Sequence, residues 1–140
     1  MFDQSLKKIM RQEKFLTASP QATVSSASRL MAEKDVGAIL VVEDERLVGI
    51  FTERDAVFRV IAKGLDPRVT TLVDVMTASP KTLGPAASYG HALLLMHENS
   101  FRHIPVIENG CLIGIVSSRN AMDPDLEEFV SEARRREHHR

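Results

Sequence analysis

Two short stretches of the sequence carry the side chains best suited to hold an anionic ligand. They read Gly49-Ile50-Phe51-Thr52-Glu53-Arg54-Asp55 and Gly114-Ile115-Val116-Ser117-Ser118-Arg119-Asn120, so a glycine, a hydroxyl residue, an arginine and a carboxylate or amide recur at one spacing. A hydroxyl residue at the start of a helix lies beside free backbone N–H groups and the positive end of the helix dipole, which favour phosphate. The arginine adds a fork of donors for phosphate oxygens, and the last residue can accept hydrogen bonds from ribose hydroxyls. The pattern predicts a nucleotide site at each junction.

The same spacing has a second, purely structural interpretation. A hydroxyl residue followed three positions later by an acidic or amide residue is also typical of a capping box, in which the two side chains close the first turn of a helix. Either junction alone is better explained in this way. Both junctions also hold the glycine and the arginine, which capping does not require, and their recurrence favours ligand binding.

The two junctions belong to an internal repeat with an offset of 65 residues. The pairs that share this offset are Thr17 and Thr82, Pro20 and Pro85, Ala27 and Ala92, Met31 and Met96, Gly49 and Gly114, and Ile50 and Ile115. Because each copy has only about 60 residues, near the lower limit for independent stability, we expect the copies to share a core. The sequence thus predicts a first unit over residues 1–66, a second over 67–131 and a charged tail over 132–140.

Each copy is expected to run strand, helix, two-stranded hairpin and helix. Apolar residues at three- and four-residue spacing predict the helices, and runs of branched apolar residues predict strands buried on both faces. Asn109-Gly110 tolerates positive φ and predicts a tight hairpin turn, with Asp44-Glu45 in the matching place. The predicted elements are helices at Val24–Met31 and Tyr89–Met96, strands at Gly37–Val42, Leu47–Phe51, Ile104–Ile107 and Leu112–Val116, and helices from Thr52 and Ser117. This order predicts a mixed α/β (α+β) fold.

Composition and charge exclude several classes of protein. The 140 residues include 18 Lys and Arg against 19 Asp and Glu, a net charge of −1, and aromatic residues make up 5%. We therefore expect no nucleic-acid binding, since the chain has neither a basic field nor enough rings to stack bases. The apolar runs are far shorter than the roughly 18 to 20 residues of a membrane span, and the first residues do not read as a secretory signal. Together with the single Cys111, these features predict a cytoplasmic protein without a membrane segment.

Motifs for catalysis are missing from the sequence. It contains neither a glycine-rich phosphate loop nor a dinucleotide-binding fingerprint. His91, His97 and His103 are spaced six residues apart and do not share a helical face, so no metal site is expected. Cys111 lies among apolar neighbours in a predicted strand and is expected to pack rather than to attack a substrate. We expect neither an enzyme nor a catalytic cofactor.

These motifs occur in the same order in both copies, and together they resemble a tandem pair of CBS domains, the regulatory module first described in cystathionine β-synthase. The resemblance covers the chain from about Ser5 to Phe129. It is carried by Ile9-Met10 and Val75-Met76, by Val36–Val42 and Phe101–Val106, and by the two junctions. It implies two β-α-β-β-α units related by a pseudo-twofold axis and packed through their sheets, with a nucleotide cleft on each side. It also implies a homodimer.

The resemblance assigns residues to both clefts. One would use Asp55, Thr52 and Arg54, with Thr17 and Ala38 near the base and with Arg102 and His103 reaching across to the phosphates. The other would use Asn120, Ser117 and Arg119, with Thr82 and His103 or Ile104 near the base. For Arg102 and His103, a surface arginine and a histidine satisfied by backbone stay open as the alternative. Because the amide of Asn120 is neutral, we expect the second cleft to bind more weakly or to stay empty.

These observations predict a regulatory, non-catalytic module that binds an adenine nucleotide between its halves. AMP, ADP or ATP is the expected ligand, with S-adenosylmethionine or a dinucleotide as further candidates. Binding is expected to alter the packing or the dimer geometry, which a partner protein reads. The alternative is a structural homodimerisation module whose junctions only cap helices, and a small nucleotide-processing enzyme is the least favoured interpretation.

Overall fold

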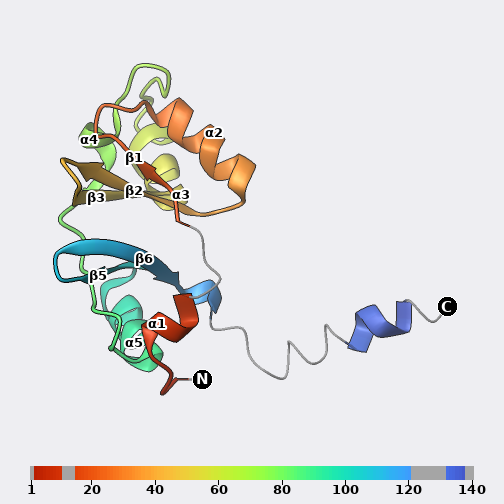
Figure 1. The fold of residues 1–140 in the computed structure, drawn as a ribbon. Helices are drawn as coiled ribbons and strands as arrows, with labels where there is room; N and C mark the ends of the chain where they lie inside the picture. Colours follow the sequence, from red (N-terminus) through yellow and green to blue (C-terminus); the bar gives the residue numbers. More distant parts are fainter. Residues whose placement is uncertain (1, 11–14, 121–131, 138–140) are drawn as a thin grey trace.

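The computed structural model describes residues 2–10, 15–120 and 132–137, and its ribbon shows two similar halves facing each other (Figure 1). The first half contains β1 (Thr17–Ala18), α2 (Val24–Lys34), β2 (Ala38–Glu43), β3 (Arg46–Thr52), α3 (Glu53–Asp55) and the π-helical turns η2 (Ala56–Ile61). The second contains α5 (Tyr89–Asn99), β5 (His103–Glu108), β6 (Cys111–Ser117) and the short 3-10 helix η3 (Ser118–Asn120). Beyond η3, the helix predicted to follow Ser117 and the predicted end of the second unit lie outside the described residues. The predicted mixed α+β fold is confirmed.

The hairpins of the two halves have the same register. β2 pairs antiparallel with β3, with Val41 opposite Gly49, and β5 pairs antiparallel with β6, with Val106 opposite Gly114. Directly after this pair, each hairpin has a register shift. Each residue of the first pair lies 65 positions before its counterpart in the second, so the repeat seen in the sequence is also a repeat of backbone pairing.

Both hairpin turns use two successive residues with positive φ, as predicted. Asn109 and Gly110 have φ angles of 51° and 78°, and Asp44 and Glu45 have φ angles of 50° and 65°. Glycine and asparagine adopt this region readily, whereas the Cβ of glutamate crowds the backbone there. The turn of the first half is therefore the more strained of the two.

The apolar side chains form three clusters, one in each half and one between the halves. The first-half cluster lies between α2 and the inner strands, and the second-half cluster lies between α5 and its hairpin. The third cluster joins the two sheets and contains Ala38, Leu40, Ile50 and Ile115, with Phe15, Leu47 and Leu112 against it. Figure 1 shows the resulting layers, with α2 and α5 on the outer faces and the two hairpins stacked between them. None of the helices in the described ranges is long and apolar enough to cross a membrane.

The segment that opens each half packs against the other half. The first of these segments, α1 (Leu6–Ile9), buries Leu6 in the second-half cluster, and the backbone N–H of Leu6 donates to the carbonyl of Ala87 at 2.9 Å. The second, α4 (Leu72–Val75), buries both its end residues in the first-half cluster, and β4 (Thr77–Ala78) pairs with β3. The division of the chain between residues 66 and 67 stays a prediction. Across this division, α1 packs in the second half and α4 packs in the first half.

The junction glycines make room for methionines rather than for a ligand. A Cβ atom built on Gly49 would collide with Sδ of Met76, and one built on Gly114 would lie 2.6 Å from Sδ of Met10. Met10 follows α1 and reaches β6 of the second half, and Met76 follows α4 and reaches β3 of the first half. Both glycines thus accept a thioether, a group that fills irregular gaps well.

Candidate functional site

The junction after β3 forms a closed ring of hydrogen bonds between Thr52 and Asp55. The carboxylate oxygen Oδ2 of Asp55 accepts from the backbone N–H of Thr52 at 2.9 Å and from its hydroxyl at 3.1 Å. The backbone N–H of Asp55 donates to the Thr52 hydroxyl at 3.2 Å, so a capping box is present. Asp55 is only 6% exposed. The capping box that the spacing predicts is therefore present, and any ligand would meet a carboxylate that is already held in place.

Arg59 holds the other oxygen of Asp55, a role that sequence analysis did not assign. Its Nε atom lies 3.4 Å from Oδ1 of Asp55, and its Nη1 atom donates to the carbonyl of Met76 at 2.9 Å. The i, i+4 spacing from Asp55 was the available signal, because residues four apart are neighbours on a helix. Arg59 thereby links the first junction to the segment that leads into β4.

The largest cavity near the first junction combines side chains from both halves. It has a volume of about 700 Å³. Its lining includes five residues predicted for the first site, which are Thr52, Arg54, Asp55, Arg102 and His103. The guanidinium of Arg54 lies 4.7 Å from the ring centroid of Phe58, another lining residue, so this arginine stacks on an aromatic face at the cavity wall.

Two residues predicted for the first site lie elsewhere. Among the described residues, neither Thr17 nor Ala38 lines the first cavity. Thr17 is exposed on β1, where it pairs with Leu40, and Ala38 lines another cavity. In their place, the segment around β4 contributes residues that sequence analysis did not assign. These are Thr77, Ser79, Pro80 and Lys81.

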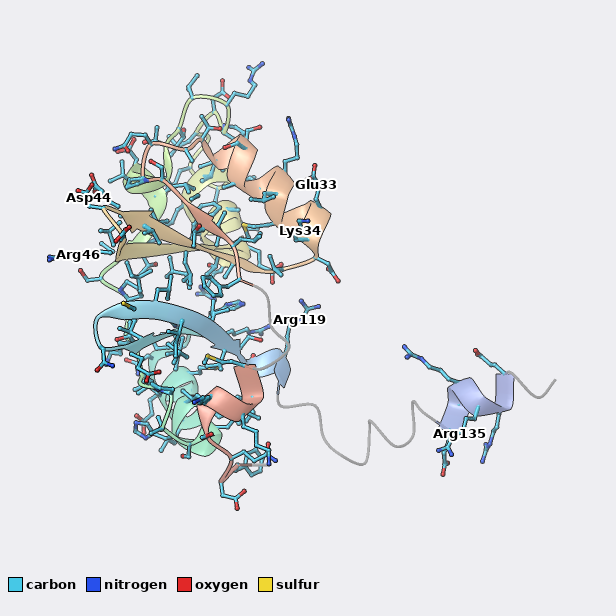
Figure 2. The ribbon with its side chains drawn as sticks, viewed as in Figure 1. Glu33, Lys34, Asp44, Arg46, Arg119 and Arg135 are labelled. Atoms are coloured by element: carbon cyan, nitrogen blue, oxygen red, sulfur yellow. The ribbon has the colours of Figure 1, made fainter. Side chains whose placement is uncertain are left out.

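The second junction faces a smaller cleft of about 430 Å³. Ser117 and Arg119 line it together with Ala38, and Phe15 and Lys34 close its sides. Figure 2 shows Arg119 at the level where the two halves meet. The side chain of Asn120 lies outside the described part of the structure. Each junction therefore meets side chains of the opposite half. The prediction for Ala38 is wrong in its cleft, since Ala38 lines the cleft of the second junction instead of the first.

The remaining two predictions for the second site are not brought to it. The side chain of Ile104 is fully buried in the second-half cluster, where it faces Tyr89 and Val116 rather than a cleft. Thr82 is exposed, and it is not among the described residues that line the three cavities near the junctions.

His103 lies where the cavities meet. It lines both clefts and a third cavity of about 410 Å³ that adjoins the second cleft. Burial lowers the pKa of His103; Glu53 acts in the opposite direction, and Arg119 and Arg102 lower the pKa further. The ring is therefore held mainly neutral at a point from which it can contact a ligand on either side.

Each junction makes a matching backbone hydrogen bond within its own half. The N–H of Glu53 donates to the carbonyl of Gly37 at 3.0 Å, and the N–H of Ser118 donates to the carbonyl of Arg102 at 3.0 Å. These bonds fix each helix start against the strand that begins beside it. Within the described ranges, no three His, Cys, Asp or Glu side chains gather as metal ligands would.

The repeated halves and the paired junctions agree with a comparison against known families. A model of the CBS domain matches residues 6–62 and again residues 72–124. The chain belongs to the CBS-domain family. CBS-domain pairs are generally regulatory proteins and are typically non-catalytic.

Relatives of this CBS pair differ in how much of their length the pair covers. The meiotically up-regulated gene 70 protein of Schizosaccharomyces pombe is 36% identical over 122 residues, which cover 79% of this chain but only 17% of that protein. A protein with CBS domains from Burkholderia ambifaria superposes with a TM-score of 0.80 at 32% identity, over 84% of this chain and 90% of the other. The protein PAE2072 of Pyrobaculum aerophilum, solved in complex with AMP, has a TM-score of 0.77 at 22% identity, over 91% of this chain and 98% of the other. The last likeness concerns the fold alone.

Proposed function

We propose that this CBS pair is a regulatory module that binds an adenine nucleotide in the cleft around Asp55. One observation carries the proposal: a cavity of about 700 Å³ brings a buried, oriented carboxylate together with basic side chains from both halves. This volume lies within the range of roughly 300 to 1,000 Å³ that is usual for small-molecule sites.

The lining of the cleft offers a binding partner for each part of a nucleotide. The Asp55 carboxylate offers acceptor lone pairs to ribose hydroxyls, and the ring of hydrogen bonds with Thr52 fixes its orientation. Arg54 and Arg102 supply forked donors for phosphate oxygens. Ile50 and Phe101 offer apolar surface for a purine. PAE2072 carries AMP on this same fold, although the choice of nucleotide by this chain rests on its own residues.

Isothermal titration calorimetry tests the proposal directly. We expect heat of binding with at least one of AMP, ADP and ATP, with S-adenosylmethionine and NAD as further candidates in the same panel. Asp55→Ala is expected to abolish the heat. The matched control is Asp66→Ala, because Asp66 is an exposed aspartate that pairs with Arg68 and lines none of the three cavities.

Two outcomes of this titration would contradict the proposal. The first is an absence of binding by the folded wild-type protein for every ligand of the panel. The second is equal binding by the wild type and Asp55→Ala. Circular dichroism of each variant shows whether it is folded, and thermal denaturation gives a second readout, since a ligand at a hundredfold excess over its Kd stabilises the native state by about 2.7 kcal/mol.

We further propose that the module is a homodimer whose interface includes η2. Val57, Phe58 and Ile61 are 50%, 55% and 71% exposed, and they form an apolar row on these turns. Phe58 also lines the Asp55 cleft, so a bound nucleotide would touch a side chain of this row. Sedimentation velocity is expected to show a dimer that Ile61→Lys weakens. A wild-type monomer at all concentrations would contradict the interface, whereas a dimer indifferent to every nucleotide would favour the purely structural module.

A further inference from the structure

The Asp55 cleft has an excess of positive charge. Arg54, Arg59, Lys81 and Arg102 line it against a single carboxylate, Asp55. Arg59 is already paired with that carboxylate at 3.4 Å. Within the described ranges, the other three basic side chains make no ion pair. Three cationic groups thus surround the cleft without an acidic partner.

The second cleft has a smaller excess of positive charge. Lys34 and Arg119 are the basic residues of its lining, and Asp35 is the acidic one. The cavity that adjoins it adds a second carboxylate, Glu53, beside Asp35 and Arg119. The two clefts are therefore related by the repeat in backbone but differ in charge.

We propose that the Asp55 cleft selects a nucleoside diphosphate or triphosphate over a monophosphate, and that the second cleft does not. This inference rests on the nucleotide site proposed above and names the ligand class of that site. Each additional phosphate brings negative charge and further acceptor oxygens, and hydrogen bonds between ionised partners are about twice as strong as neutral ones. A cleft of about 700 Å³ also leaves more room for a longer phosphate chain than the 430 Å³ of the second cleft.

The unpaired basic groups come from different parts of the chain. Arg54 follows β3, Lys81 follows β4 and Arg102 precedes β5, so a polyphosphate would draw on both halves at once. A monophosphate carries fewer oxygens and cannot engage as many of these groups. The selection for phosphate number therefore comes from the meeting of the halves rather than from either junction.

Calorimetric titration with adenosine, AMP, ADP and ATP tests the inference, in buffer without divalent cations. We expect ADP or ATP to bind at least about tenfold more tightly than AMP, which corresponds to about 1.4 kcal/mol. The ratio should shrink as salt is raised, because salt screens partly exposed charges. Lys81→Gln should weaken the binding of ADP and ATP more than the binding of AMP, so the ratio of their affinities should fall toward one. Lys63→Gln, an exposed lysine outside all three cavities, is the control.

The outcomes separate this inference from the proposed function. Equal affinities for AMP, ADP and ATP, or a Lys81→Gln protein with unchanged discrimination, would overturn the preference for polyphosphate while the nucleotide site stands. Arg102→Gln provides a second variant on the opposite half, and it should reduce the same discrimination. If none of these ligands binds, and neither S-adenosylmethionine nor NAD binds, the proposed function fails and the inference fails with it.

Discussion

Replacement of Asp55 by asparagine separates what the carboxylate does for the fold from what it does for a ligand. In the structure, Oδ2 of Asp55 accepts two hydrogen bonds from Thr52, and Oδ1 lies 3.4 Å from Nε of Arg59. Asparagine has nearly the same shape and keeps one acceptor oxygen, but it has no charge. The variant also gives the first junction the residue type that the second junction has at Asn120.

The expected loss of stability follows from these contacts. A hydrogen bond to a charged group contributes about 1.5 to 3 kcal/mol and a neutral one about 0.5 to 1.5 kcal/mol. The ion pair adds little, because the Arg59 side chain is 50% exposed. Burial of a neutral amide also costs less than burial of a carboxylate, which offsets part of the loss. We therefore expect Asp55→Asn to lower the free energy of unfolding by about 1 to 2 kcal/mol, or Tm by about 3 to 8 °C.

Urea denaturation of the wild type, Asp55→Asn and Asp66→Asn measures this difference without ligand. The exposed Asp66 serves as the control, and its variant should stay within about 0.5 kcal/mol of the wild type. Asp55→Asn remains folded under this estimate, so its nucleotide affinity can be measured as well, and we expect it to fall about tenfold or more as the ribose loses a charged acceptor. An unchanged stability would refute the role of Asp55 in closing the helix start. An unchanged affinity in a folded variant would refute its role toward the ribose.

Three further predictions concern other parts of the molecule. Burial lowers the pKa of His103 in the native state, whereas in the unfolded chain this histidine has its ordinary pKa of 6.5. The unfolded chain therefore binds a proton more readily, and the free energy of unfolding should fall as the pH drops below about 7. His103→Gln should flatten that decline in urea denaturation at pH 7.5 and 5.5; an equal decline in both proteins would count against it. Gly49→Ala should destabilise the fold by about 1 to 3 kcal/mol by pushing Met76 aside, and the loss should be smaller when it is measured in a Met76→Ala background. Glu45→Gly should stabilise the first hairpin by about 1 kcal/mol, because Glu45 has a φ of 65°; a lower Tm would contradict this.

The sequence predicts the fold well because its signals are local and occur twice. The apolar spacing of Val24 and Ala27 on α2, and the branched run along β2, are repeated 65 residues later, so each copy supports the assignment of the other. The turn at Asp44 and Glu45 could be placed only because its copy holds Asn-Gly. Without the repeat, Glu45 would not have suggested a position with positive φ.

The composition of the clefts could not be predicted in the same way. Ala38 on β2 and Asp55 on α3 belong to one unit, yet they line different cavities, each together with side chains of the opposite half. Lys81 carries no motif at all and reaches the first cavity only because β4 pairs with β3. Both facts depend on contacts between distant parts of the chain. The weaker binding expected at Asn120 stays a prediction.

The most direct test of the central claim is a crystal structure of the protein with ADP. We expect the nucleotide in the cleft between the halves, with its ribose hydroxyls within hydrogen-bond distance of the Asp55 carboxylate and its phosphates beside Lys81 and Arg102. An empty Asp55 cleft at saturating ADP, or a nucleotide bound elsewhere on the molecule, would contradict the account.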